Sequence, residues 1–280
     1  MTAKIIDGKK ISEKILNELK SKVKNLKQKP GLAIVLVGNN PASEIYVNTK
    51  DKTCKEIGFY CERFNLDKDT SEMDLLKLVE ELNQNAKMHG ILVQLPLPNQ
   101  IDEKLIVNSI LPHKDVDGFT PLSLGNLMSD NAIIAPATAR AVMSLIESTG
   151  ISIEGKNAVV VGRSKIVGKP VAIMLLEKNA TVTICHSKTK NLAEHTKKAD
   201  ILVAAVGKAG LITKEMVKEG AVVIDVGINR VEGKIVGDVD FENIKEIAGY
   251  ITPVPGGVGP MTIAMLMENT LKAMELAKRI

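Results

Sequence analysis

Aromatic residues are scarce in this 280-residue sequence, which has no tryptophan, three tyrosines and four phenylalanines. Proteins that bind single-stranded nucleic acid stack bases on aromatic side chains, and few are present here. The net charge is +4, and the 25% of charged residues are of both signs and well mixed, without a concentrated basic stripe. The sequence therefore argues against a nucleic-acid partner and favours a small anionic ligand.

Cysteine and histidine are also few. Cys54, Cys61 and Cys185 have no Cys-x-x-Cys spacing, and the four histidines form no His-Glu-x-x-His motif. We expect free thiols and no metal. The N-terminal MTAKIIDGKKISEKI carries charges throughout, and no apolar run approaches the ~18 residues of a membrane span. These absences predict a cytoplasmic protein without a membrane segment.

Apolar runs that resemble strands alternate with segments of helical periodicity along nearly the whole chain, a pattern typical of parallel α/β sheets. The length allows two such domains. Prolines and turns between residues 96 and 137 interrupt the alternation and predict a domain junction there. The predicted strands are 31–37, 59–64, 90–95, 157–162, 180–185, 200–206, 221–226 and 249–251.

Residues 158–170, AVVVGRSKIVGKP, run from a strand through a glycine turn into a helix, the context that binds phosphate in dinucleotide folds. NAD-binding folds place a carboxylate at the end of the next strand, where this chain has Cys-His-Ser. Without that acid, Arg163 and Ser187 suit the 2′-phosphate of NADP. The alternative is a surface arginine and a helix-capping Ser164.

A second group of candidates begins with Lys50. Tyr46, Lys50 and Cys54 fall at i, i+4 and i+8 of a predicted helix, so the lysine shares a face with an aromatic ring and apolar groups. Partial desolvation lowers the pKa of such an ammonium and suits it to proton transfer near neutral pH. A lysine that snorkels from the helix edge would have the same spacing.

Three further segments hold candidate ligand contacts. Gln94 ends the apolar run GILVQLPLP, where ligands bind in open parallel sheets, although a glutamine that closes a turn would look the same. Asp115 and Asp117 precede Gly118 in HKDVDGF, which on its own is most often a turn. The proline- and glycine-rich YITPVPGGVGPMT suggests a rigid loop whose backbone approaches a flat ligand closely.

Six segments in this order, NPASEIYVNTK, GILVQLPLP, DVDGF, GRSKIVGKP, DVGINR and TPVPGGVGPMT, resemble the bifunctional methylenetetrahydrofolate dehydrogenase/methenyltetrahydrofolate cyclohydrolase family over essentially the whole chain. The resemblance implies a homodimer of two-domain α/β subunits. Residues 1–137 would form the catalytic, folate-binding domain, with the helix 261–280 packed back on it. Residues 138–260 would form a Rossmann-like NADP-binding domain, with the folate in the cleft between the two.

The resemblance also implies roles for individual residues. Lys50 would be the catalytic lysine, Tyr46 would line the folate site, Gln94 would hydrogen-bond near Lys50, and Asp117 would hold the pterin. The cofactor positions would be Gly162, Arg163, Ser164, Ser187 and Ile228, and the loop with Pro255, Gly256 and Gly257 would form a wall of the folate site.

The chain departs from the family pattern at two places. Thr120, Ser123 and Asn126 stand where His, Asn and Arg are common, and Ala137, Ala139 and Ala141 stand where Cys, Pro and Gly are usual. These departures concern substrate affinity and the balance of the two activities more than the type of reaction.

The function implied is the NADP-dependent oxidation of 5,10-methylenetetrahydrofolate to the methenyl compound, followed by hydrolysis to 10-formyltetrahydrofolate. These steps belong to one-carbon metabolism, which serves purine and amino-acid biosynthesis. Alternatives are a member with one activity only, a non-catalytic nucleotide-sensing relative, or an NADP-dependent oxidoreductase of a small carbonyl acid. The last leaves IYVNTK and PVPGGVG without a role.

Overall fold

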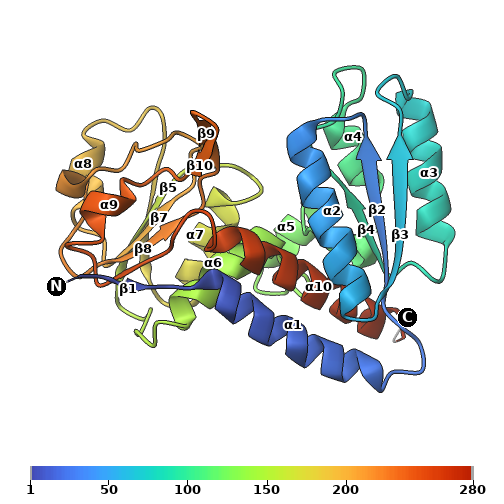
Figure 1. The fold of residues 1–280 in the computed structure, drawn as a ribbon, viewed down its shortest axis with the longest axis horizontal. Coiled ribbons are helices and arrows are strands. Elements are labelled where there is room, and N and C mark those ends of the chain that lie inside the picture. The colour runs from blue at the N-terminus through green and yellow to red at the C-terminus, as the bar shows by residue number, and fades with distance from the viewer. Residues whose placement is uncertain (1, 279–280) are drawn as a thin grey trace. The chain divides into compact units, whose positions relative to one another are not determined.

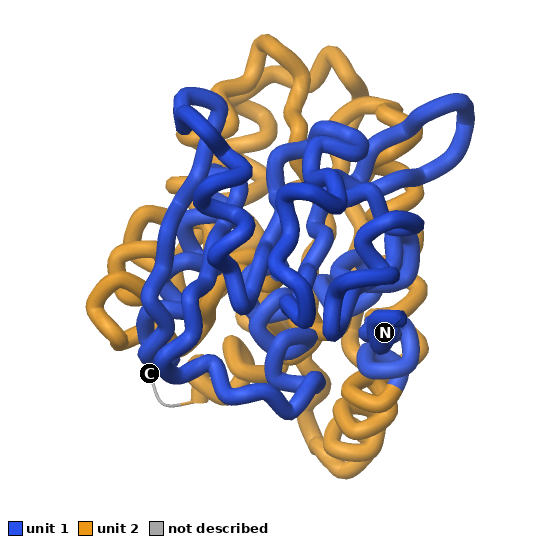
Figure 2. Tube along the Cα trace, turned by 90° about the vertical axis from the view of Figure 1, so that its left-hand side faces the viewer, with its two compact units in different colours: residues 1–13, 138–262 blue, residues 14–137, 263–280 orange. Residues whose placement is uncertain are grey.

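The structure, a computed structural model, describes residues 2–278 (Figure 1). The chain forms two compact units, each of which combines two segments of sequence (Figure 2). Unit 1 contains residues 1–13 and 138–262, and unit 2 contains residues 14–137 and 263–280. Both units are built on parallel sheets, which confirms the predicted α/β class.

Unit 2 has a three-stranded parallel sheet in the order β3-β2-β4. The central strand is buried along its whole length, and the helices that follow β2 and β3 return the chain to the same end of the sheet. Its strands are β2 (Gly31–Val37), β3 (Tyr60–Leu66) and β4 (Gly90–Val93), and its helices include α2 (Pro41–Glu56), α3 (Glu72–Gln84), α4 (Glu103–Ser109), η1 (Pro112–Lys114) and α5 (Pro121–Met128).

Helix α2 begins where its sequence predicts. The Asn40 side chain accepts hydrogen bonds from the backbone N–H groups of Ala42 and Ser43, and Pro41 occupies the first helical position. Gly58, with a φ of 85°, follows the end of the helix. The sequence alone thus fixes the two ends of the helix that carries Lys50.

Unit 1 has a six-stranded sheet in the order β1-β11-β8-β7-β5-β6, and every pair of neighbours is parallel. Its strands are β1 (Lys4–Ile5), β5 (Asn157–Val161), β6 (Thr181–Cys185), β7 (Ile201–Ala204), β8 (Val222–Asp225) and β11 (Tyr250–Ile251). The other elements are α6 (Ala137–Glu147), α7 (Gly168–Glu177), α8 (Leu192–Thr196), η2 (Lys214–Met216), α9 (Phe241–Ile244) and the hairpin β9 (Asn229–Val231) and β10 (Lys234–Val236).

Two long helices belong to both units by residue number: α1 (Gly8–Lys24) and α10 (Val258–Ala277). Each predicted strand coincides with an observed one to within two residues at either end. Strand β1 and the hairpin β9–β10 were not predicted. Over residues 2–278, no helix has both the length and the apolar character needed to cross a membrane.

A buried carboxylate holds together the loops that follow β8 and β10. Asp225, at the end of β8, is 3% exposed. Its Oδ1 accepts hydrogen bonds from the backbone N–H groups of Gly227 and Asp238, both at 2.9 Å, and its Oδ2 accepts one from Val239 at 3.0 Å. No side chain would fit at Gly237, where a Cβ atom would lie 1.8 Å from Asp225 Oδ2.

A second buried carboxylate, that of Asp238, binds the loop after β7 in the same way. Its carboxylate accepts hydrogen bonds from the backbone N–H groups of Val206, Gly207 and Lys208 at 2.7 to 3.0 Å, and from the Asn229 amide at 3.0 Å. The loops after three elements therefore share two buried acids, which fixes this edge of the sheet.

We predict that Asp225 makes unit 1 less stable as the pH rises. Burial raises the pKa of Asp225 from 3.8 to about 6, despite the hydrogen bonds that lower it. The folded state therefore binds the proton more tightly than the unfolded chain, and this stabilisation is lost as the pH rises through about 6. Relative to Asp225→Asn, the wild type should lose up to ~1.4 kcal/mol of unfolding free energy per pH unit between about 4 and 6. Urea unfolding at several pH values measures this, and parallel pH profiles would contradict it.

Candidate active site

Lys50 and Gln94 are joined in unit 2 across the carboxyl end of its sheet. Lys50 lies in α2 and is partly buried, and its Nζ donates a hydrogen bond to Gln94 Oε1 at 3.0 Å. Gln94 directly follows β4, and its backbone N–H donates to Val35 of β2 at 2.9 Å. The Gln94 amide nitrogen donates to the Leu95 carbonyl at 2.7 Å, so the amide oxygen is the atom turned toward Lys50. The ammonium group is thus held on a rigid edge of the sheet.

Asp117 lies near enough to Lys50 for the two charges to interact. Burial lowers the pKa of Lys50, and the Asp117 carboxylate partly opposes this. Burial also raises the pKa of Asp117, which Lys50 lowers and Asp115 raises further. The pKa of each group is therefore moved toward neutrality, the direction that proton transfer near neutral pH requires.

Tyr46 lies one helical turn before Lys50 on α2 and is partly exposed, while Cys54, one turn after Lys50, is fully buried. Residues four apart on a helix lie on the same face, so Tyr46 and Lys50 face the same region. Lys50 does not snorkel to solvent as a free charge, because it has a hydrogen-bond acceptor and a nearby carboxylate.

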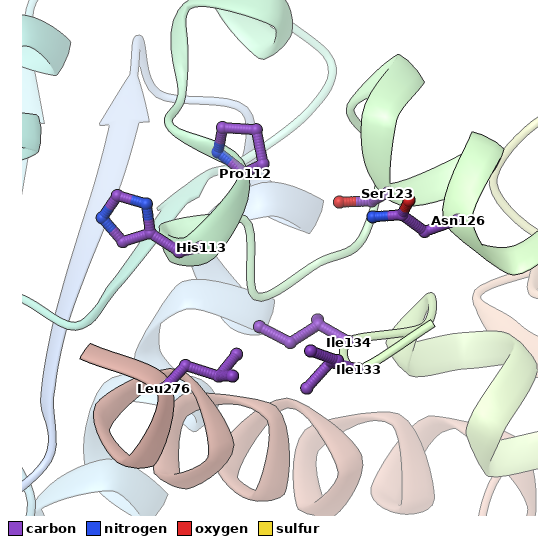
Figure 3. A pocket seen from close by; sticks show the side chains of 7 residues that line it. All are labelled: Pro112, His113, Ser123, Asn126, Ile133, Ile134 and Leu276. Carbon is purple, nitrogen blue, oxygen red and sulfur yellow. The ribbon is translucent and has the colours of Figure 1, made fainter. Parts of the chain in front are cut away.

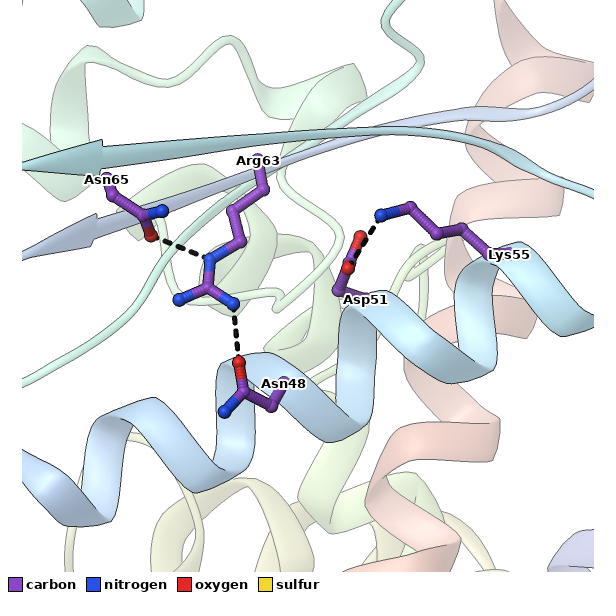
Figure 4. A network of polar contacts seen from close by, with 5 residues as sticks. All are labelled: Asn48, Asp51, Lys55, Arg63 and Asn65. Carbon is purple, nitrogen blue, oxygen red and sulfur yellow. Dashed lines mark hydrogen bonds and ion pairs between the residues drawn. The ribbon is translucent and has the colours of Figure 1, made fainter.

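A polar network fastens α2 to the neighbouring strand β3 (Figure 4). Arg63 of β3 donates through Nη1 to Asn48 of α2 and through Nε to Asn65 at 2.6 Å. One turn along α2, Lys55 forms an ion pair with Asp51 at 2.7 Å. The Lys55–Asp51 pair lies within α2, so the hydrogen bond from Arg63 to Asn48 is the contact of this network that joins the helix to β3.

The predicted nucleotide turn lies in unit 1, between β5 and α7. Gly162 has a φ of 135°, and a Cβ atom there would lie 2.2 Å from the Ala205 carbonyl oxygen. Ser164 Oγ accepts hydrogen bonds from the backbone N–H groups of Val167 and Gly168 at 3.1 and 3.2 Å, so its hydroxyl caps the start of α7. Arg163 is exposed in the same turn.

Two other predicted cofactor positions share the edge of the sheet with this turn. Ser187 follows β6 and Ile228 follows β8, and both are exposed. Because β5, β6 and β8 belong to one parallel sheet, their carboxyl ends meet at the same edge. The turn after β6 is fixed by a hydrogen bond from the His186 backbone N–H to Thr189 Oγ1 at 2.8 Å.

The loop after β11, with Pro255, Gly256 and Gly257, also belongs to unit 1. Pro255 is exposed, and Gly256 has a φ of 109° and accepts a hydrogen bond from the Lys9 backbone N–H at 2.9 Å. Gly257 packs so closely that a Cβ atom on Gly8 would lie 2.1 Å from its carbonyl oxygen. The glycines thus allow two backbone segments to touch.

A cavity of about 210 Å³ in unit 2 was not predicted (Figure 3). Its lining is mainly apolar and includes two positions at which the chain departs from its family pattern, Ser123 and Asn126. The other lining residues are Pro112, His113, Ile133, Ile134 and Leu276. Within residues 2–278, no group of three or more His, Cys, Asp or Glu side chains could hold a metal ion.

Comparison with known families assigns both parts of the chain. Residues 6–117 match the model of the tetrahydrofolate dehydrogenase/cyclohydrolase catalytic domain, and residues 136–278 match that of the NAD(P)-binding domain of the same proteins. The chain is 58% identical to the bifunctional protein FolD of Moorella thermoacetica, over 98% of this chain and 99% of that protein. It is 53% identical to FolD of Thermodesulfovibrio yellowstonii over 100% and 99%.

Solved structures agree with these matches. The bifunctional methylenetetrahydrofolate dehydrogenase/cyclohydrolase FolD of Campylobacter jejuni superposes with a TM-score of 0.96 at 49% identity, over 99% of this chain and 100% of that chain. The Trypanosoma brucei enzyme, solved with NADP and an inhibitor, superposes with a TM-score of 0.95 at 39% identity over 100% of both chains.

Gly162→Ala should destabilise the protein more than Gly155→Ala, which is the matched control. Both glycines have a positive φ, which costs a non-glycine residue about 1 to 3 kcal/mol. Only Gly162 also lacks room for a Cβ atom, since nothing lies within 4 Å of one at Gly155. We expect Gly162→Ala to lose ~2 kcal/mol more of unfolding free energy in urea. Equal losses would show that the close approach to Ala205 does not require glycine.

Proposed function

The chain belongs to the tetrahydrofolate dehydrogenase/cyclohydrolase family, and on this premise we propose that it catalyses both reactions of the family at one site. It oxidises 5,10-methylenetetrahydrofolate to 5,10-methenyltetrahydrofolate with NADP and then hydrolyses the product to 10-formyltetrahydrofolate. The observation that carries this proposal is the hydrogen bond from Lys50 to Gln94, within the electrostatic influence of the Asp117 carboxylate.

The oxidation requires positioning more than acid–base chemistry. When bound, NADP accepts the hydride from the methylene carbon while a neighbouring folate nitrogen supplies its lone pair to form the methenyl cation. The residues of the chain then have to hold the pterin in place, which is the role proposed for Asp117 and Tyr46. The loop with Pro255, Gly256 and Gly257 is proposed to form a wall of the same site.

The hydrolysis requires proton transfer. Water adds to the cationic methenyl carbon and loses a proton, and a ring nitrogen gains one as the ring opens. Lys50 can carry out such an exchange because burial lowers the pKa of its ammonium group, and the Gln94 oxygen keeps Nζ in one position. The Asp117 carboxylate raises the pKa of Lys50 and so partly offsets the lowering that burial causes.

The cofactor site is proposed at the carboxyl edge of the sheet in unit 1. Gly162 permits the tight turn after β5, and Ser164 fixes the start of α7 by accepting hydrogen bonds from the backbone N–H groups of Val167 and Gly168. The positive end of the helix dipole at this position favours phosphate. Arg163 and Ser187 are proposed to bind the 2′-phosphate, and Ile228 to contact the cofactor from the loop after β8. The relative solved with NADP supports this choice of cofactor.

We further propose a catalytic domain of residues 1–137 with the helix 261–280, and an NADP domain of residues 138–260. The family matches, which end at 117 and resume at 136, support a boundary near 137, but the NAD(P)-binding match continues to 278 and residues 1–13 belong to unit 1 through β1. A cytoplasmic homodimer is proposed as the working form. Three free cysteines suit a reducing compartment. The edge strand β6 exposes Ile184 (41%), and α7 exposes Leu176 (62%), an apolar surface suited to a second copy. Sedimentation velocity tests the dimer.

The direct test of the proposed function is to mix the protein with NADP and methylenetetrahydrofolate. We expect the absorbance of NADPH to rise and the methenyl chromophore to appear and then decay. The absence of both signals would refute the proposed function.

We predict that Arg163→Ala weakens NADP binding and leaves NAD binding within about twofold of wild type. The lost pair between the guanidinium and the phosphate should cost ~1.5 to 3 kcal/mol, or about tenfold to more than a hundredfold in affinity. Lys178→Ala is the control, because this exposed cation lies at the opposite end of α7. Titration with each cofactor provides the measurement, and equal use of NAD and NADP by the wild type would refute the assignment.

Lys50→Met should separate the two activities. Methionine keeps most of the side-chain length that positions the folate, but it cannot exchange protons. We expect most of the dehydrogenase activity to remain and the cyclohydrolase activity to fall at least about a hundredfold. NADPH formation and methenyl decay are followed separately, in a buffer that does not catalyse hydrolysis.

Lys52→Met is the control for this change, since Lys52 is an exposed lysine of the same helix, with 76% of its side chain accessible. Cyclohydrolase activity within a few-fold of wild type in Lys50→Met would rule out proton transfer by Lys50. Wild-type protein with only one of the two activities would instead indicate a monofunctional member of the family.

A further inference from the structure

The loop that carries Asp117 folds around a second carboxylate, that of Asp115. Asp115 is 1% exposed. Its Oδ1 accepts hydrogen bonds from the backbone N–H groups of Gly118 at 2.9 Å and Phe119 at 3.1 Å. The backbone on the C-terminal side of Asp117 is therefore turned back toward the side chain two residues before it.

The other oxygen of Asp115 fixes the start of α5. Asp115 Oδ2 accepts hydrogen bonds from the Thr120 backbone N–H at 2.8 Å and from Ser123 Oγ at 2.7 Å. Thr120 Oγ1 in turn donates to Ser123 Oγ at 2.9 Å and accepts from the Ser123 backbone N–H at 3.2 Å. One buried acid thus satisfies four donors, and two of the residues involved are departures from the family pattern.

The same loop is held from its other sides. Asp115 forms a parallel bridge with Ile91 of β4, and the Asn269 amide donates to the Val116 carbonyl at 2.8 Å. Gly118 has a φ of 73°, and a Cβ atom there would lie 2.7 Å from the Pro136 nitrogen. With its neighbours fixed in this way, the backbone of Asp117 has little freedom.

We propose that Asp115 is a positioning residue for folate: its carboxylate shapes the 115–120 turn so that Asp117 stays beside Lys50, and Ser123 is the side-chain donor that orients it. This inference rests on the proposed function. Removal of one acceptor that serves four donors would let the turn relax, and Asp117 would lose its place relative to Lys50.

Asp115 also acts on Asp117 through its charge. The charged groups that act on Asp117 are Lys50, from α2, and Asp115, from the same loop. Asp115 raises the pKa of Asp117, so loss of its charge should lower that pKa. A residue with a purely structural role would reduce activity at every pH without such a shift.

The test is Asp115→Asn in the full-length protein, with Asp102→Asn as the control. Asp102 is an exposed carboxylate of unit 2 that caps α4 by accepting from the Lys104 backbone N–H at 2.8 Å. We expect the folate KM of Asp115→Asn to rise about tenfold and the NADP KM to stay within about twofold. The acidic limb of kcat/KM should move to lower pH, and Asp102→Asn should match the wild type. An unchanged folate KM would overturn the proposal, as would a uniform loss without a pH shift.

A second pair of variants decides the question even where Asp115→Asn does not fold. Ser123→Ala removes one donor to Asp115 without changing charge, and Ser123→Thr keeps the hydroxyl. We expect the folate KM to rise about threefold in the alanine variant and to stay near wild type in the threonine variant. Equal KM values in the two variants would overturn the proposal. A wild-type protein without dehydrogenase activity would refute the proposed function instead, so the two failures can be told apart.

Discussion

The partly buried ammonium group of Lys50 is the feature on which the candidate site depends. A charge removed from water costs several kcal/mol unless acceptors and opposite charges replace its hydration. Here one amide oxygen, from Gln94, and one nearby carboxylate, from Asp117, provide that compensation. Each must be held in place by other groups, so α2 is fastened to β3 through Arg63, and the backbone of Gln94 is paired with β2. The sheet thus holds the ammonium group of Lys50 in one position while it is partly removed from water.

In both units, buried carboxylates hold the loops at the carboxyl edge of the parallel sheet. Parallel strands bring their carboxyl ends to one edge of the sheet. The backbone N–H and C=O groups of the loops at that edge need hydrogen-bond partners that keep the loops in one conformation. In unit 1, Asp225 and Asp238 take up the N–H groups of several loops, and in unit 2, Asp115 does so for one. Buried carboxylates that accept backbone hydrogen bonds therefore shape the loops of the candidate sites in each unit.

Periodicity and turn chemistry were sufficient to predict the eight main strands, the caps of α2 and the spacing of Lys50 with Tyr46. They could not predict β1, because two residues give no periodicity and its partner β11 lies far along the chain. The sequence also did not predict the hydrogen bonds of Asp115. Two Asp residues shortly before Gly118 predict only a turn, and the contact of Asp115 with Ser123 depends on how α5 packs. For Ser164, the alternative of a helix cap agrees with the structure, because its hydroxyl accepts hydrogen bonds from the backbone N–H groups of Val167 and Gly168.

Two positions at which the chain departs from the family pattern, Ser123 and Ala137, donate hydrogen bonds to the loop of Asp117. On one side, Ser123 donates to Asp115. On the other, the backbone N–H of Ala137, the first residue of α6, donates to the Asp117 carbonyl at 3.4 Å. Alanine is a strong helix former, and Pro136 before it restricts the entry to the helix, so α6 begins there despite the loss of the usual proline at position 139. Of the two bonds, the one from Ser123 depends on the side chain at a departure position, whereas the one from Ala137 is a backbone bond that a cysteine at this position would also make.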